Sequence, residues 1–596
     1  MNKLSTLHTR PSSVNAVSER IVVTLALGLA VVWICWTSVN WFRYHPHLPW
    51  RDLFLVLTQV MELSRAPLDM TSLWQWFEPH YGTHRIAIPR LLLLLDTQLL
   101  SGQNHLFYAA AWLCLLLLVA LYTRLAASYF REPRTVVFTA ALASIWLFSP
   151  SHLWNLINAI NVSWHLSLAC SLLAFYLLIK RPAEPRLWDW CGAYLLCALA
   201  AFSTFAGVVA WLMLPLMACL IQPRAFIPTL LASGACAWLY VGGMASDASL
   251  ASQWDAGTPD VIAKIRALAE AALAANTPAR IMEKTLQFLG WPLSAQAPRL
   301  ALILSLGSVA ILAIVFASAL LSSVRTRERL HPWFTFCLIA AGLCLGIALA
   351  TQLGRLMVHP NHAHGPSYER YQTVVVVYWL SVSGLLMGQK PRTGVGGAVL
   401  FTALVGLAWA LQLPTGDYLR QEIQSAEAAA RLFNRGQLAH LHQSRPTAGN
   451  RFTPEFVFSF DAYFEQHQLA YRAPVASPAG LASAEPCDPE SVKLEFATIQ
   501  EIKEFAAGVE AQAVSASLTT PAARLSRAVV LYQGENLAGR LSPVHQGDYR
   551  PRSLLDPENT RWQGIAVPAG ERDWTLVLQG ATGASVLCKY TTLTTR

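Results

Sequence analysis

The residues best suited to chemistry follow the first long apolar run of the chain, 21–42. The first acid after that run is Asp52, which directly follows Arg51. An ionisable side chain costs about 2.5–3.5 kcal/mol in the middle of a bilayer, so a charged pair beside an apolar run indicates a functional site. A carboxylate there can act as a general base toward a hydroxyl. The alternative is an interfacial carboxylate that pairs with Arg51 or caps a helix over 52–63.

A second polar group lies further along the same segment. His80 and His84 stand at i and i+4 with Glu78 close by, which is one arrangement that binds a metal ion. Pro79 and Gly82 interrupt the helix that this arrangement needs, so a divalent metal is not favoured. Basic side chains also bind phosphate, and those assigned here to the donor phosphate or the substrate are Arg51, His84, Arg85 and Arg90. The alternative is that they face lipid headgroups.

A third group directly precedes the apolar run 372–388. Arg370 suits a phosphate best, because a guanidinium can donate two parallel hydrogen bonds to it. With its neighbours Tyr368 and Tyr371 it is assigned to the donor phosphate. The alternative use of this segment is a metal site on the earlier histidines, in a loop that contains Pro360 and Gly365: His359, His362 and His364.

A fourth group lies between the apolar runs 135–149 and 162–179. It contains the following residues: His152, Trp154, Asn155, Asn158, Asn161 and His165. Amide and indole donors suit sugar hydroxyls. Trp and polar residues also gather at ordinary membrane interfaces, and this interfacial interpretation is the favoured one. The candidate sugar or acceptor contacts are Glu78, His80, Asn155, Asn158 and His165.

The composition indicates an integral membrane protein. Of 596 residues, 54% are hydrophobic and only 13% are charged, with 21 Trp. The net charge is +9, and the Lys and Arg residues gather in short clusters between apolar runs. This distribution is typical of membrane topology and argues against nucleic acid as the partner. Runs of about 20 residues cross a bilayer. About eleven transmembrane helices are expected, near 21–42, 105–128, 135–149, 162–179, 187–203, 205–221, 226–244, 300–322, 333–352, 372–388 and 395–413.

The basic residues set the expected orientation. With the N-terminus in the cytoplasm, every inner loop is short and rich in Lys and Arg, as the positive-inside rule requires. The long segments, including the first outer loop 43–104, then lie outside. The run 187–221 is expected to be a tight helical hairpin with Ser203, Thr204 and Gly207 in its middle. Short helices are expected over 52–63, 70–77, 259–275 and 277–289, and a re-entrant or surface helix with Asp96 over 86–100.

The chain changes character after the last apolar run. Residues 414–487 are expected to form a helical connector, with helices over 417–442 and 453–470, and 488–596 a periplasmic β-rich domain. Six short alternating runs separated by turn residues predict a small antiparallel β-sandwich. They are 492–496, 514–518, 528–532, 562–567, 574–578 and 585–590. Cys487 and Cys588 are the two cysteines of this polar tail, and outside the cytoplasm they are expected to form a disulfide. The alternative is two buried free thiols.

The arrangement of residues 1–413, with Asp52 directly after the first span, resembles the GT-C glycosyltransferases. Enzymes of this superfamily take a sugar from a polyprenyl-phosphate carrier and transfer it to an acceptor outside the cytoplasm. The resemblance implies a bacterial inner-membrane enzyme with Asp52 as general base and no firmly expected cofactor. A β-rich tail after the spans is similar to the arabinofuranosyltransferases of cell walls and pili, whose C-terminal domains bind carbohydrate. The acceptor would be a surface glycan, a lipid-linked glycan or a pilin.

Two alternatives stay open. An O-antigen ligase-like transferase would depend on Arg and His in a late outer loop instead of Asp52, and a lipid or glycan transporter would have paired repeats and polar residues at the membrane midplane. No Gly-rich phosphate loop and no Asp-x-Asp motif in an outer loop is present in the sequence, which favours a lipid-linked donor over a nucleotide sugar.

Overall fold

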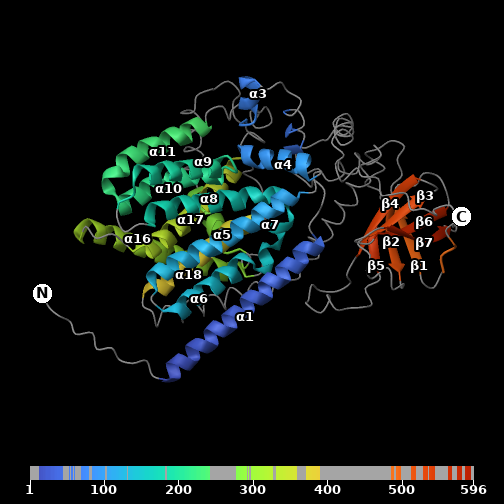
Figure 1. Ribbon diagram of the computed structural model, residues 1–596, viewed down its shortest axis with the longest axis horizontal. Helices are drawn as coiled ribbons and strands as arrows, with labels where there is room; N and C mark the ends of the chain where they lie inside the picture. Colours follow the sequence, from blue (N-terminus) through green and yellow to red (C-terminus); the bar gives the residue numbers. More distant parts are fainter. Residues whose placement is uncertain are drawn as a thin grey trace.

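The structure is a computed structural model of the chain (Figure 1). Its description covers most of the helical part and the strands of the C-terminal part. The described residues are 13–44, Leu53, 56–57, 59–60, Leu63, 69–78, 84–100, 104–130, 132–180, 184–241, 277–291, Leu293, 297–326, 331–358, 371–389, 485–488, 492–498, 512–518, 528–533, 536–543, 561–566, 573–579 and 584–591.

Ten helices coincide with the apolar runs expected to span the membrane. They are α1 (Ser13–Tyr44), α5 (His105–Tyr129), α6 (Pro133–Leu147), α8 (Val162–Ile179), α9 (Leu187–Ala201), α10 (Ala206–Ile221), α11 (Phe226–Val241), α16 (Pro298–Thr326), α17 (Pro332–Val358) and α18 (Gln372–Gln389). The eleventh run, 395–413, lies outside the described residues. This is the architecture of an α-helical membrane protein.

Fewer of these helices are long enough to cross a bilayer on their own. Among the described residues, five pass by length and composition: Arg20–Trp41, His105–Tyr129, Ala159–Ile179, Pro298–Ser318 and Pro332–Leu353. A sixth is added if Pro133–Leu147 and Pro150–Ile157, which are bent by 44° to each other, form one broken span. Three shorter apolar helices are Leu187–Ala201, Ala206–Ile221 and Gln372–Met387. The count of about eleven therefore remains a prediction.

One end of the helical unit is built around α4 (Ala87–Leu99), and we call it the α4 end. The backbone N–H of Ile88 donates to the carbonyl of Phe202 after α9, and the N–H of Arg85 donates to the hydroxyl of Tyr240 in α11. The hydroxyl of Thr37 in α1 donates to the carbonyl of Phe148, directly after α6. The α4 end thus gathers helix ends that are far apart in the sequence.

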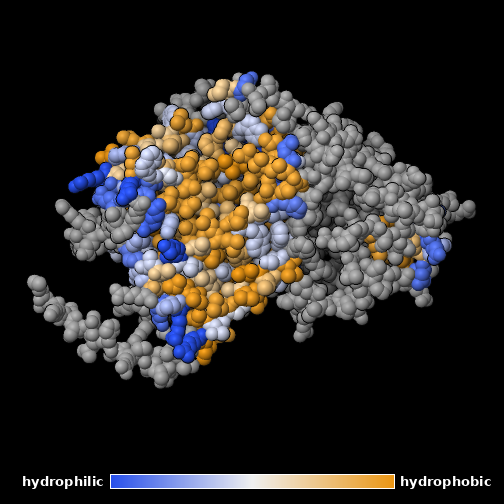
Figure 2. Space-filling model, viewed as in Figure 1, coloured by the Kyte–Doolittle hydropathy of each residue, from blue (hydrophilic) through white to orange (hydrophobic). Residues whose placement is uncertain are grey.

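The opposite end carries basic side chains, and we call it the basic end. There Lys180 forms a salt bridge with Asp189 (3.2 Å) between α8 and α9, and the Trp333 indole donates to the carbonyl of Gly384. In Figure 2, hydrophobic residues cover the middle of the helical unit and hydrophilic residues gather along its left edge. The described basic residues of this end include Arg124, Arg134, Lys180, Arg186 and Arg224. The helices therefore alternate in direction between two chemically different ends.

The turn between α9 and α10 lies at Ser203 and Thr204, where the sequence places the hairpin. Gly207 makes this turn tight, because a Cβ at that position would lie only 2.1 Å from the backbone carbonyl carbon of Ala200. The amide of Gly207 also donates to the carbonyl of Thr204. A residue with any side chain could not occupy position 207 without moving the two helices apart.

α4 forms where a re-entrant or surface helix over 86–100 is expected, and it fixes the start of α5. Both oxygens of Asp96 accept backbone N–H groups, from Asn104 (2.7 Å) and Leu106 (2.8 Å). Asn104 has a positive φ of 62°, which turns the chain into α5. Burial raises the pKa of Asp96, and the hydrogen bonds from Leu106 and Asn104 oppose that rise. Asp96 is thus a structural cap for α5.

The other short helices agree with the sequence in part. α3 (Met70–Gln75) falls within the expected 70–77, and α14 (Thr277–Leu289) coincides with 277–289. The helix over 52–63 is described at six positions only, and those over 259–275, 417–442 and 453–470 lie outside the described residues.

The C-terminal part is an antiparallel sheet of seven described strands. They are β1 (Val492–Thr498), β2 (Gln512–Leu518), β3 (Ala528–Gln533), β4 (Asn536–Pro543), β5 (Arg561–Ala566), β6 (Asp573–Gln579) and β7 (Ala584–Thr591). Their order is β1-β2-β5-β4-β3-β6-β7. They form one hydrogen-bonded sheet instead of the two sheets of a sandwich, because β5 pairs with both β2 and β4. The sequence missed β4, whose alternation of apolar residues is weak.

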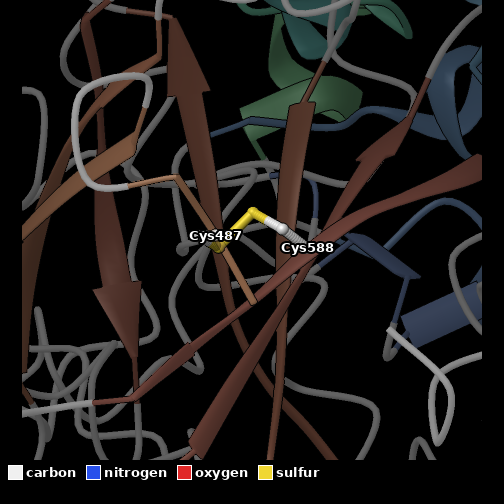
Figure 3. The surroundings of a disulfide bond; sticks show 2 residues. All are labelled: Cys487 and Cys588. Atoms are coloured by element: carbon white, nitrogen blue, oxygen red, sulfur yellow. A yellow bond between two sulfur atoms is a disulfide. The ribbon is translucent and has the colours of Figure 1, made fainter. Parts of the chain in front are cut away.

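A disulfide joins Cys487 and Cys588, the pair that the sequence predicts (Figure 3). The chain just before β1 also pairs with β7, since the Cys487 amide donates to the carbonyl of Lys589 (2.8 Å). Pro486 and Lys589 form a parallel bridge. The two edge strands of the sheet are therefore tied together, and residues such as Val492, Leu531 and Trp574 are buried in one apolar core.

Candidate functional site

A cluster of buried polar side chains lies at the α4 end, between α6 and α8. The segment 150–161 contains three short helical pieces: η1 (Pro150–His152), α7 (Leu153–Ile157) and η2 (Ala159–Asn161). Four of the seven side chains of the cluster come from this segment, and the others come from α8 and from the start of α18. Its members are His152, Asn155, Asn158, Asn161, His165, Gln372 and Thr373, and each is at most 7% exposed. We call them the polar cluster.

Hydrogen bonds connect the cluster across more than two hundred residues of sequence. His152 Nε2 lies 2.8 Å from Thr373 Oγ1, and the Asn155 amide donates to the same hydroxyl oxygen (2.9 Å). The Asn161 amide donates to Asn155 Oδ1 (3.1 Å). The rings of His152 and His165 lie 5.1 Å apart. The first turn of α18 is thereby fixed against the segment that follows α6.

The local sequence explains why the chain is irregular here. Pro150 has no N–H to continue α6 and begins a 3-10 turn instead. The hydroxyl of Tyr108 in α5 then donates to the carbonyl of Ile157 (3.2 Å), which holds the end of α7. An irregular backbone at membrane depth requires such protein partners for its polar groups.

Burial corrects the interfacial interpretation of Asn155, Asn158 and His165. Residues of an aromatic and polar belt face lipid headgroups, whereas these three side chains are 1%, 7% and 0% exposed. Sequence reasoning missed Gln372 and Thr373. Their signal was two adjacent polar residues at the first turn of an apolar helix, directly after the charged segment that ends at Tyr371.

Arg90 has a different role from the phosphate binding that the sequence suggests. Its guanidinium is 1% exposed and donates to Gln59 Oε1 (2.8 and 3.2 Å) and to the carbonyls of Trp76 and Glu78, both at 2.8 Å. Burial lowers its pKa to about 10, and the nearby Glu78 partly opposes this. The guanidinium therefore holds the chain around α3 onto α4 and is occupied by protein acceptors.

Arg85 is occupied in a similar way. Its Nε donates to the carbonyl of Tyr240 (2.9 Å), its Nη1 donates to the carbonyl of Phe77, and its Cζ lies 5.7 Å from the centre of the Tyr240 ring. Burial lowers its pKa, and Tyr240 and then Glu78 oppose that shift. Like Arg90, it anchors the segment before α4 and is not placed as a phosphate ligand.

The structure describes only some of the other predicted site residues. Asp52, Arg51, His80, Tyr368 and Arg370 lie outside the described residues, as do His359, His362 and His364. Glu78 is exposed and His84 is partly buried. Tyr371 is buried and packs on Trp164 (ring centres 4.9 Å apart) and on Phe288 (5.3 Å). Of the predicted residues, the structure brings together Asn155, Asn158 and His165 in the polar cluster, with Tyr371 directly before Gln372. It brings Arg90 and Glu78 together in a separate group.

The segment next to Asp52 is anchored in the helical core. Leu53, the residue after Asp52, is 1% exposed, and Val56, Leu57 and Val60 are fully buried in the same core cluster. Gln59 in this segment is the acceptor for Arg90. The end of α1 reaches the same region, because its Trp41 ring packs edge-on against Tyr108 (5.5 Å). The described residues before and after Asp52 therefore include contacts at the α4 end.

Comparisons with known proteins give no relatives: no family model, no curated protein and no solved structure matches the chain. Within the described part of the chain, no group of three or more His, Cys, Asp or Glu side chains is arranged to hold a metal ion.

Proposed function

We propose that this protein is a membrane-embedded glycosyltransferase that takes a sugar from a polyprenyl-phosphate carrier. The basic end would face the cytoplasm and the α4 end the periplasm of a bacterial inner membrane, in accordance with the distribution of Lys and Arg. The acceptor would be a surface glycan, a lipid-linked glycan or a pilin.

One observation carries this proposal. The burial of Leu53, Val56, Leu57 and Val60 anchors the chain that follows Asp52 at the end of the helical unit that also holds the polar cluster. Under this proposal, the carboxylate joined to that anchor would work with the polar cluster, whose uncharged donors and acceptors are of the kind that bind sugar hydroxyls. These are the two parts that a sugar transfer needs, a base and a sugar contact surface.

The proposed reaction is a single displacement. Asp52 takes the proton of the acceptor hydroxyl, the acceptor oxygen bonds to the anomeric carbon, and the bond from that carbon to the phosphate oxygen breaks. The polyprenyl phosphate leaves with its charge stabilised by Arg370, and the sugar is inverted at the anomeric carbon. Arg51, His84 and Tyr368 are further candidate contacts to the phosphate. Arg85 and Arg90 are not included, because protein acceptors already occupy them.

The test compares Asp52→Asn with Glu62→Gln, a matched loss of a carboxylate in the same outer segment. Surface glycans and pilins from strains that carry each variant are analysed by mass spectrometry. We expect Asp52→Asn to remove one sugar residue, since losing a general base costs about 10²–10⁴-fold in rate. Glu62→Gln should leave the glycans unchanged.

Unchanged glycans in the Asp52→Asn strain would reject the proposal. If Arg370→Ala alone abolished transfer, and only from a pyrophosphate-linked glycan, the ligase-like alternative would hold instead.

The β-rich domain 488–596 is proposed to bind the acceptor. Protein that ends at residue 487 should then transfer sugar to a large acceptor about tenfold or more slowly, because the tethered domain raises the local acceptor concentration. Transfer to a short soluble acceptor should be unaffected. Equal rates with the large acceptor for both lengths of chain would exclude this role.

A further inference from the structure

The two histidine rings determine which atoms of the polar cluster donate hydrogen bonds and which accept them. Nδ1 of His152 lies 2.7 Å from the carbonyl of Leu147, and Nδ1 of His165 lies 3.0 Å from the carbonyl of Asn161. A carbonyl oxygen can only accept, so both Nδ1 atoms carry the proton. Nε2 of each neutral ring is then a hydrogen-bond acceptor.

The hydrogen bonds that run to His152 follow from this tautomer. Its Nε2 accepts from the hydroxyl of Thr373, whose oxygen accepts from the Asn155 amide, and Asn155 Oδ1 accepts from Asn161. Every hydrogen bond along that chain of four side chains therefore has one donor and one acceptor. This part of the cluster is complete without a ligand.

The remaining side chains are incomplete. Among the described residues, His165 Nε2, Asn158 Oδ1 and both amide atoms of Gln372 are buried without a hydrogen-bond partner. They belong to the same region: the carbonyl of Asn158 accepts from the amide of Asn161, whose own carbonyl bonds His165. The rings of Trp164 and Tyr371, the residues directly before His165 and Gln372, lie 4.9 Å apart. A buried polar atom that lacks a partner is costly, so several such atoms gathered in one cluster point to a place where a partner binds.

The chemistry of these atoms defines the class of partner. They comprise three acceptors, His165 Nε2, Asn158 Oδ1 and Gln372 Oε1, and one donor group, Gln372 Nε2. No charged side chain belongs to the cluster. A phosphate or carboxylate offers only acceptors, so it would meet the three acceptor atoms with no proton to share. A hydroxyl both donates and accepts.

We propose that His165, Asn158 and Gln372 form a subsite for an uncharged polyhydroxyl ligand, the sugar ring itself, apart from the group that binds the phosphate. The inference rests on the proposed function and deepens it. His165 accepts a hydrogen bond from one sugar hydroxyl through Nε2, and Gln372 donates to one hydroxyl and accepts from another.

The test uses full-length protein in lauryldimethylamine oxide, a detergent without a sugar headgroup. The probes are methyl α-D-mannopyranoside, methyl α-D-glucopyranoside and methyl α-D-arabinofuranoside, with undecaprenyl phosphate as the probe for the phosphate site. His165→Asn keeps a donor near the position of Nδ1 but has no acceptor at the position of Nε2, whereas His165→Gln places an acceptor there. Gln372→Leu removes both amide atoms of Gln372, which lack a partner in the described structure. Ser167→Ala is the matched control, because Ser167 Oγ is also buried without a partner in the described structure but lies two residues along α8 on another face.

We expect at least one methyl glycoside to bind the wild type, Ser167→Ala and His165→Gln with similar affinity. His165→Asn and Gln372→Leu should bind it about tenfold or more weakly, the cost of one lost hydrogen bond to a buried group. Binding of undecaprenyl phosphate should be the same in all five proteins. Size-exclusion chromatography identifies any variant that fails to fold. If either His165→Asn or Gln372→Leu fails, the other one decides the test.

Equal glycoside binding in all five proteins, no glycoside binding by the wild type, or a loss confined to undecaprenyl phosphate would each overturn the subsite. Asp52→Asn separates this from the proposed function. Glycoside binding without Asp52-dependent transfer would reject the transferase alone, and Asp52-dependent transfer without glycoside binding would reject the subsite alone.

Discussion

Two buried polar groups at the α4 end differ in how completely they are satisfied. The guanidinium of Arg90 carries a charge and donates to one amide oxygen and three backbone carbonyls. The polar cluster carries no charge, yet four of its buried polar atoms have no partner within the described structure. A charge can be buried only when it is paired, so Arg90 had to be satisfied by the protein itself. Burying a neutral polar atom without a partner costs less free energy than burying an unpaired charge, so such atoms can be present before a ligand binds. Burial alone therefore does not identify a binding site, whereas several open hydrogen-bonding atoms gathered in one cluster point to one.

The largest expected effect on stability comes from removing the Arg90 guanidinium, whose hydrogen bonds the protein satisfies. Arg90→Met leaves Gln59 and the carbonyls of Trp76 and Glu78 without their donor, so we expect a loss of about 3 kcal/mol in stability. Thermal unfolding of the detergent-solubilised protein, followed by tryptophan fluorescence, measures this. Arg299→Met removes an exposed guanidinium and should change stability by less than about 0.5 kcal/mol. Similar unfolding temperatures for the two variants would show that Arg90 is not a structural anchor.

Asp96 gives an intermediate effect, because it satisfies two backbone groups. Asp96→Ala leaves the N–H groups of Asn104 and Leu106 without an acceptor and should cost about 1–2 kcal/mol. Hydrogen exchange at the first turn of α5 should rise correspondingly. Asp96→Asn keeps one acceptor oxygen and should lose less. Exchange that is unchanged in Asp96→Ala would mean that α5 is capped in another way.

The smallest effect on stability is expected in the polar cluster, and it has the opposite sign. Gln372→Leu removes two buried atoms that have no protein partner, so stability should stay the same or rise by up to about 1 kcal/mol. The same thermal measurement tests it, with Thr373→Val as the contrast, because Thr373 is bonded to His152 and Asn155 and should lose stability. A clear loss of stability in Gln372→Leu would show that its amide is satisfied in the protein and would remove it from the sugar subsite.

The sequence by itself determined the helices and the covalent link of the β-rich part. Long apolar runs must become helices, since a bilayer leaves no other way to satisfy their backbone groups, and ten of the expected runs are helical. Cys487 and Cys588 stood alone in a polar tail, so their pairing needed no knowledge of the fold. Gly207 likewise marked the tight turn of the α9–α10 hairpin.

Only the tertiary structure decided what the polar side chains do. The sequence shows Arg90 beside an apolar run, where phosphate, headgroup and protein carbonyls are equivalent partners. Its acceptor Gln59 lies 31 residues earlier and comes close only through packing. In the same way, His152 meets Thr373 across 221 residues, which joins a polar position that the sequence singles out to one that it does not. A hydrogen bond is specified by distance and direction, and these depend on contacts between helices that hydrophobic periodicity does not encode.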